Sequence, residues 1–143
     1  MAWYNKGKAS ILNGAVDLLA DTIKVILVNN TYAFDADHNF ISQVNSTELS
    51  GTGYTAGFAG SGRKTLAGKA VNEVDASDYA AFDANDVTWT AINAGTAAGV
   101  ILVKEVTVDG DSLLIAHIAF SSVVTNGGDL TLQWDANGIL QLT

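Results

Sequence analysis

Short apolar runs, separated by glycine, asparagine and aspartate, fill the sequence after residue 68. In the run 87–92, Val87 and Trp89 alternate with Thr88 and Thr90. Alternation of β-branched and aromatic residues with polar ones indicates a strand with two different faces. Trp89 is large enough to anchor a core between two sheets. The sequence therefore predicts a protein built mainly of β-strands.

The strand pattern recurs along the chain at short intervals. The chain has 14 glycines and no proline, so its turns depend on Gly, Asn and Asp. An Asp-Gly pair between apolar runs, as at Asp109-Gly110, predicts a hairpin. About eight short strands favour an all-β fold, a β-sandwich of the jelly-roll or Greek-key type. We expect these strands at residues 23–29, 69–74, 79–82, 87–92, 99–108, 112–120, 130–134 and 139–143.

One short helix is expected near the N-terminus. Apolar residues recur at helical spacing within residues 9–20, and Asp21-Thr22 ends the pattern. The length of 143 residues fits one domain, which we place at residues 9–143, after an N-terminal arm at residues 1–8. The expected core consists of Ile23, Val25, Leu27, Val87, Trp89, Ile101, Val103, Leu114, Ala116, Ile118, Leu130, Leu132 and Leu140.

The composition argues against several classes of function. A net charge of −8 with only 7 scattered Lys and Arg argues against nucleic-acid binding. The absence of Cys excludes disulfides and thiolate chemistry, and it fits a reducing cytosol. No apolar run approaches the roughly 20 residues that span a membrane, and the N-terminal sequence lacks the apolar part of a secretion signal. We therefore expect no nucleic-acid partner and no membrane.

Two short motifs resemble ligand-binding loops but depart from them. Residues 35–39, DADHN, begin like a calcium loop, but Phe40 replaces the required Gly and Ser46 the required Glu. Residues 57–65, GFAGSGRKT, resemble a phosphate-binding loop, but Arg63 interrupts the motif. We interpret the first as a polar turn and the second as a flexible loop tip.

No set of residues predicts catalysis. His117 lies in an apolar run with one other His in the chain, which favours a partly buried structural role. The aspartates at the expected turns, including Asp109, are the kind that bond to nearby backbone amides. The sequence therefore predicts a protein that is not an enzyme and that has no cofactor and no metal site.

The N-terminal arm is a candidate partner-binding segment. Trp3 and Tyr4 are large anchors, and Lys6 and Lys8 are cations in an otherwise acidic protein. Two interpretations stay open: the arm docks on a partner chain, or Trp3 and Tyr4 pack on the domain's own core.

The polar segment 31–63 is a second candidate. It looks too polar to fold on itself, yet it carries five aromatic residues: Tyr32, Phe34, Phe40, Tyr54 and Phe58. Only 15% of the chain is charged, and charge is depleted where proteins meet. We therefore expect a homo-oligomer, a trimer rather than a dimer, in which this segment packs against a sister subunit or another partner.

Several blocks carry a resemblance to a known family. They are WYNKGK, LNGAVDLLADTIKVILV, LAGKAV, FDANDVTWT and GGDLTLQWDANGILQLT, which together span most of the chain outside residues 31–63. These blocks resemble the capsid decoration (cement) proteins of tailed phages. The resemblance implies a β-sandwich that is made in the host cytoplasm and sits on the outer surface of the virion head. There it would bridge and stabilise major capsid proteins, and no active site carries over.

Two other classes of protein stay open at this stage. One is a different virion part, such as a head fibre base or a tail-associated protein, which would form a ring or tube. The other is a carbohydrate-binding β-sandwich, which requires an exposed aromatic platform. Trp3, Trp89 and Trp134 are too dispersed in the sequence to argue for such a platform.

Overall fold

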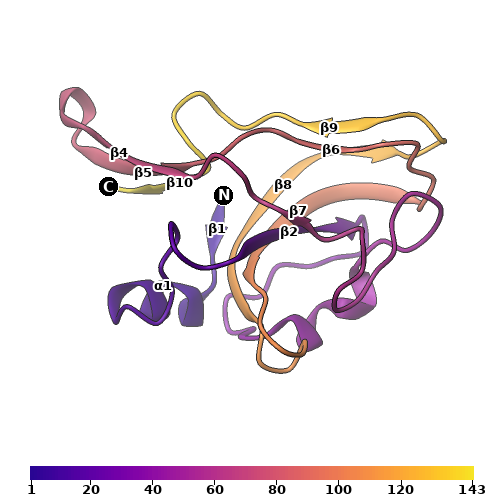
Figure 1. Ribbon diagram of the computed structural model, residues 1–143, viewed down its shortest axis with the longest axis horizontal. Helices are drawn as coiled ribbons and strands as arrows, with labels where there is room; N and C mark the ends of the chain where they lie inside the picture. Colours follow the sequence, from indigo (N-terminus) through magenta and orange to yellow (C-terminus); the bar gives the residue numbers. More distant parts are fainter.

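The computed structural model describes residues 1–143, and it consists of antiparallel β-sheets and one α-helix (Figure 1). The largest sheet has five strands in the order β1-β8-β7-β2-β3. Its strands are β1 (Ala2–Trp3), β8 (Leu113–Val124), β7 (Thr96–Lys104), β2 (Ile23–Asn29) and β3 (Lys64–Thr65). The all-β expectation with one helix is thus confirmed.

Two smaller sheets accompany the five-stranded sheet. One has the order β10-β5-β4, and it projects beyond the other strands at one end of the molecule (Figure 1). The other pairs β6 with β9, which run side by side along the top of the view. These strands are β4 (Ala70–Val74), β5 (Tyr79–Asp83), β6 (Val87–Trp89), β9 (Leu130–Leu132) and β10 (Leu140–Leu142). Short 3₁₀ turns occur at Ile41–Gln43, Asn45–Thr47 and Asp75–Ser77.

Both faces of the five-stranded sheet are buried. Ile23, Val25 and Leu27 of β2 face one apolar cluster, whereas Ile26 and Val28 face a second cluster. The near-continuous apolar sequence of β2 follows from this, because neither face of the strand meets water. The first cluster contains Trp89, and the second contains Tyr4, Ile41 and Val44.

The expected core is largely confirmed. Ten of its thirteen members are buried, and Ile118, Leu130 and Leu132 are half-buried. These members do not form one layer, because Ile101, Val103 and Leu114 belong to the second cluster. The segment that covers this second face comes from the polar region 31–63, whose Ile41 and Val44 are buried.

The helix lies earlier in the chain than the periodicity predicts. Helix α1 spans Asn5–Leu12, so the expected range 9–20 is correct only for residues 9–12. Gly14 adopts a φ of 75°, which ends the helix. Beyond it, the Asp17 carboxylate accepts hydrogen bonds from the backbone of Leu19 and Ala20 at 2.9 and 3.0 Å. Aspartate commonly stabilises such a turn through local backbone bonds.

The N-terminal residues belong to the domain. Strand β1 pairs with β8, and the backbone N–H of Tyr4 donates to Ile115 O at 3.1 Å. The Tyr4 side chain is fully buried. Residues 1–8 are therefore not the separate arm that we expected, because they form an edge strand and the first half of α1.

Helix α1 lies so close to β8 that one of its positions admits only glycine. A Cβ atom at Gly7 would lie 2.6 Å from Ile115 O. Ile115 is the extra residue of a β-bulge, since Leu102 pairs with Ala116 and Val103 pairs with Leu114. The bulge thus places a carbonyl group where the helix backbone approaches the sheet.

We expect Gly7→Ala to lower the free energy of unfolding by about 1–3 kcal/mol, because the helix must move away from Ile115. Urea denaturation measures the loss. Gly110→Ala is the control, since a Cβ there meets no atom within 4 Å. Equal stability of the two variants would show that α1 is not held against β8.

Candidate functional site

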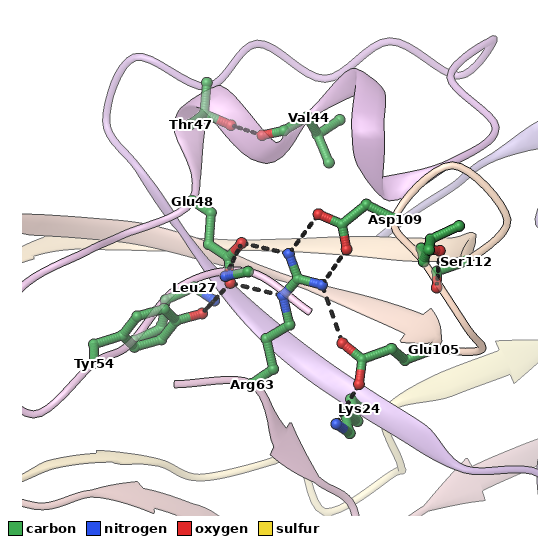
Figure 2. A network of polar contacts seen from close by, with 12 residues as sticks. Lys24, Leu27, Val44, Thr47, Glu48, Tyr54, Arg63, Glu105, Asp109 and Ser112 are labelled. Carbon is green, nitrogen blue, oxygen red and sulfur yellow. Dashed lines mark hydrogen bonds and ion pairs between the residues drawn. The ribbon is translucent and has the colours of Figure 1, made fainter. Parts of the chain in front are cut away.

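A buried ionic network centred on Arg63 joins three distant segments of the chain (Figure 2). The guanidinium donates to Glu48 from Nε at 2.9 Å and from Nη2 at 2.7 Å. It donates to Asp109 from Nη1 at 2.6 Å and from Nη2 at 3.0 Å, and to Glu105 from Nη1 at 3.0 Å. All five guanidinium N–H groups of Arg63 therefore have acceptors.

Other groups extend the network into the sheet and the loop. The second oxygen of Glu105 pairs with Lys24 of β2. The Tyr54 hydroxyl donates to Glu48 at 3.2 Å and accepts the backbone N–H of Leu27 at 3.0 Å. Each of the three carboxylates thus has at least one cationic partner, and none is left unpaired.

The centre of the network lies out of water, whereas Asp109 and Lys24 at its margins are partly exposed. The Arg63 side chain is fully buried, and the side chains of Glu48 and Glu105 are 1% and 4% exposed. Burial by itself lowers the pKa of Arg63, but the bonds to Glu48 and Asp109 outweigh it and raise that pKa above its ordinary value. Burial also raises the pKa of Tyr54. With these raised pKa values, Arg63 stays charged and Tyr54 stays neutral at neutral pH, so the network is suited to holding segments together.

The network corrects two predictions. The segment 57–65 is not a free loop tip, because Arg63 within it is fully buried. Asp109 does more than complete a turn, because its carboxylate binds Arg63. One sequence signal was available: Arg63 is the single arginine among 7 basic residues, and arginine suits buried ion pairs better than lysine does. Its partners are far apart in sequence, so spacing could not identify them.

A cluster of aromatic rings lies beside the N-terminus. The rings of Tyr4 and Phe34 have centroids 5.0 Å apart, and Phe34 stacks on His117 at 5.8 Å. Tyr32 meets His117 edge-on at 4.9 Å, and its hydroxyl bonds to that of Tyr4. Burial lowers the pKa of His117. The cluster holds three of the predicted partner-binding residues, but only Phe34 among them is exposed, at 37%.

The other predicted partner-binding residues do not gather in one place. Lys6 and Lys8 are exposed on α1, and Phe58 is 48% exposed. Trp3 and Phe40 are half-buried. Tyr54 is buried against Trp89, with ring centroids 6.5 Å apart, so it contributes to the core and not to the surface.

The segment 31–63 folds on its own domain. It places Ile41, Val44, Leu49 and Tyr54 in the core, and Arg63 holds it to the rest of the chain. The expectation that this segment is too polar to pack without a partner is therefore wrong. Of the five aromatic residues in this segment, Phe34 and Phe58 are the ones exposed enough to contact a partner.

The structure also contains an apolar groove that the sequence did not predict. A groove of about 270 Å³ lies between the end of β8 and the neighbouring strand β9. Its lining is mostly apolar and comprises Leu27, Trp89, Phe120, Ser121, Val123, Leu130, Thr131 and Leu132. Val123 is 40% exposed and Val124, next to the groove, is 69% exposed. Apolar exposure of this kind is typical of a protein-binding surface.

The geometry offers no metal-binding group of three or more His, Asp or Glu side chains. None of the helices has the length and apolar character needed to cross a bilayer. No family model matches the sequence, and no curated protein or solved structure is similar to the chain.

Proposed function

We propose that the protein is a structural component of a tailed-phage virion, a capsid decoration protein on the outer surface of the head. In this proposal it is a β-sandwich of jelly-roll or Greek-key type. It binds and bridges major capsid proteins as a homo-oligomer after synthesis in the host cytoplasm. It carries out no catalysis.

One observation carries this proposal: all five sequence blocks that carry the family resemblance contribute to the wall of one cavity. An apolar cavity of about 50 Å³ lies between α1 and the sheet β10-β5-β4. Each block contributes a residue to its wall: Trp3, Leu18, Val71, Phe82 and Leu140. Blocks that are far apart in sequence therefore build one structural unit, which supports a resemblance in the whole fold over a set of unrelated local matches.

The surface of the molecule supports the same function. Net charge is −8, so the protein does not compete for packaged DNA. The exposed apolar residues, Val123 and Val124 among them, suit contacts between proteins. The Arg63 network gives the loops of the domain a defined shape, which helps a small protein to bind a shell without first ordering itself.

The direct test is sedimentation of the purified protein with capsids of the phage that encodes it. We expect the protein to sediment with expanded capsids and to remain in solution with isolated tails. Binding to tails, or to neither, contradicts the decoration function. A density map of the virion would then show where the protein sits.

Lys6 and Lys8 supply a sharper form of the same test. Deletion of residues 1–8 is unsuitable, since it removes Tyr4 from the core. We expect the double change Lys6→Gln and Lys8→Gln to leave the fold intact and to weaken capsid binding several-fold, because both side chains are exposed cations. Thr90→Glu with Thr107→Glu is the matched control, because it lowers the net charge equally at exposed positions elsewhere. Equal binding by the two variants would remove α1 from the contact surface.

A further inference from the structure

Strand β8 has an open outer edge over more than half of its length. β8 runs over Leu113–Val124, and its outer neighbour β1 pairs only with Ala116 and His117. No strand pairs with the outer edge of residues 118–124. The backbone N–H and C=O groups on that side are therefore free to pair with another chain.

The edge lacks the devices that usually prevent such pairing. Lys, Pro and inward-pointing charges commonly protect edge strands. Residues 112–128 contain no Asp, Glu, Lys, Arg or Pro. Residues 121–124 are all exposed, and Val123 and Val124 present apolar side chains to water. The edge is therefore neutral, and it is accessible at residues 121–124, whereas Ile118 and Phe120 are half-buried.

A β-bulge adds to the unpaired groups. Ala119 pairs with Gly99 of β7, and the next pair joins Val123 to Ala97. Residues 120–122 thus have no register partner in β7 either. A second strand along the open edge supplies partners for those backbone groups of β8 that point away from β7.

We propose that the open edge of β8, residues 118–124, pairs antiparallel with the same edge of a second copy and forms a two-fold symmetric dimer. A pair centred on Ser121 places Ala119 opposite Val123 and Phe120 opposite Ser122, and it satisfies the same groups in both copies. Such a contact between identical patches is the commonest form of protein oligomer.

The charge distribution makes the β8 edge a place where two copies can meet with little repulsion. Each copy carries a net charge of −8, so two copies repel wherever their carboxylates approach. The β8 edge brings no charged side chain of its own to the contact. The other edge strands are poorer partners: β1 and β3 have 2 residues each, β6, β9 and β10 have 3 each, and β4 carries Glu73. Of these edges, β8 alone is both long and neutral.

Pairing also covers the apolar groove beside the edge. Phe120 and Val123 line that groove together with Leu130 and Leu132 of β9. The second copy brings its own Phe120 and Val123 to the same place, so apolar side chains leave water on both sides of the axis. The dimer goes beyond the proposed function and does not depend on it. It replaces the trimer that the sequence favoured.

Cysteine cross-linking on the purified full-length chain locates the two-fold axis, because the native sequence has no Cys. Single Cys variants are made at each of residues 119–123 and at Thr88, an exposed control on β6. We expect oxidised dimer to form most readily at Ser121 and to decline toward Ala119 and Val123, because only the residue on the axis meets its own copy directly. Equal cross-linking at Thr88, or a maximum elsewhere, would overturn the proposal.

A charge placed on the axis gives the second test. We expect the unmodified protein to sediment as a dimer, and Ser121→Lys to weaken dimerisation about ten-fold or more, because two like charges then face each other across the axis. Thr107→Lys, at an exposed position in the loop between β7 and β8, is the control and should leave the dimer intact. Circular dichroism establishes that both variants fold. A monomer in the unmodified protein up to millimolar concentration, or a dimer that persists in Ser121→Lys, contradicts the proposal.

Discussion

Replacing Arg63 with methionine is expected to lower the free energy of unfolding by about 3–5 kcal/mol. Methionine keeps much of the volume of the arginine stem, so the main loss is electrostatic. The substitution would remove the cation that three carboxylates share, those of Glu48, Glu105 and Asp109. Glu48 has no other cationic partner and is 1% exposed, so its carboxylate would stay buried without compensation.

Urea denaturation followed by fluorescence measures this loss. Lys64→Met is the matched control, because it removes the same charge from the neighbouring residue, which forms no salt bridge. We expect the control to change stability by less than about 1 kcal/mol. Similar losses in the two variants would mean that net charge, and not the network, sets the stability.

The network also explains why the connection between β7 and β8 differs from the hairpin that the sequence predicts. The two strands do pair as expected, but β7 ends at Lys104 and β8 begins at Leu113. The Asp109-Gly110 pair does turn the chain, since the Asp111 N–H donates to Val108 O at 3.1 Å, but this turn lies within the loop 105–112 and does not join the strand ends directly. Glu105 and Asp109 instead turn toward Arg63, and the longer loop lets both reach it. A local turn signal could not reveal an ion pair with a residue 46 positions away.

Local pattern was most reliable where a strand lies deep in the molecule. The expected strand 23–29 coincides with β2, because burial on both faces leaves a continuous apolar run. The pattern was least reliable near the N-terminus. There Gly7 and Ser10 are the buried residues of α1, and neither is apolar enough to signal a helix face. Close backbone approach to β8, and not hydrophobic periodicity, decides where that helix lies.

The candidate surface was harder to predict than the fold. Aromatic residues in a polar segment suggested partner contact, yet Tyr4 and Tyr54 are core residues. The open β8 edge could not be predicted, because its sequence does not differ from that of a central strand. Whether a strand lies at an edge depends on sheet order, and sheet order is set by contacts between distant parts of the chain.

The second large effect is expected at Trp89, whose replacement by alanine should lower the free energy of unfolding by about 3–5 kcal/mol. The side chain is fully buried and belongs to the cluster that joins β6 to the five-stranded sheet. Its Nε1 donates to Gly62 O at 2.7 Å. Alanine would leave both a cavity and an unpaired buried carbonyl one residue before Arg63.

Two further variants separate these contributions. Trp89→Phe keeps most of the ring volume and removes the donor, so it should cost about 1–2 kcal/mol if the bond to Gly62 matters. Trp134→Ala is the exposure control: this half-buried indole also donates to a backbone carbonyl, Asn85 O at 3.0 Å. We expect Trp134→Ala to lower the free energy of unfolding by about 1 kcal/mol, since water can replace much of the lost hydrogen bond.

A loss below about 1 kcal/mol for Trp89→Ala would place Trp89 outside the core. The packing of β6 and β9 against the five-stranded sheet would then need another explanation.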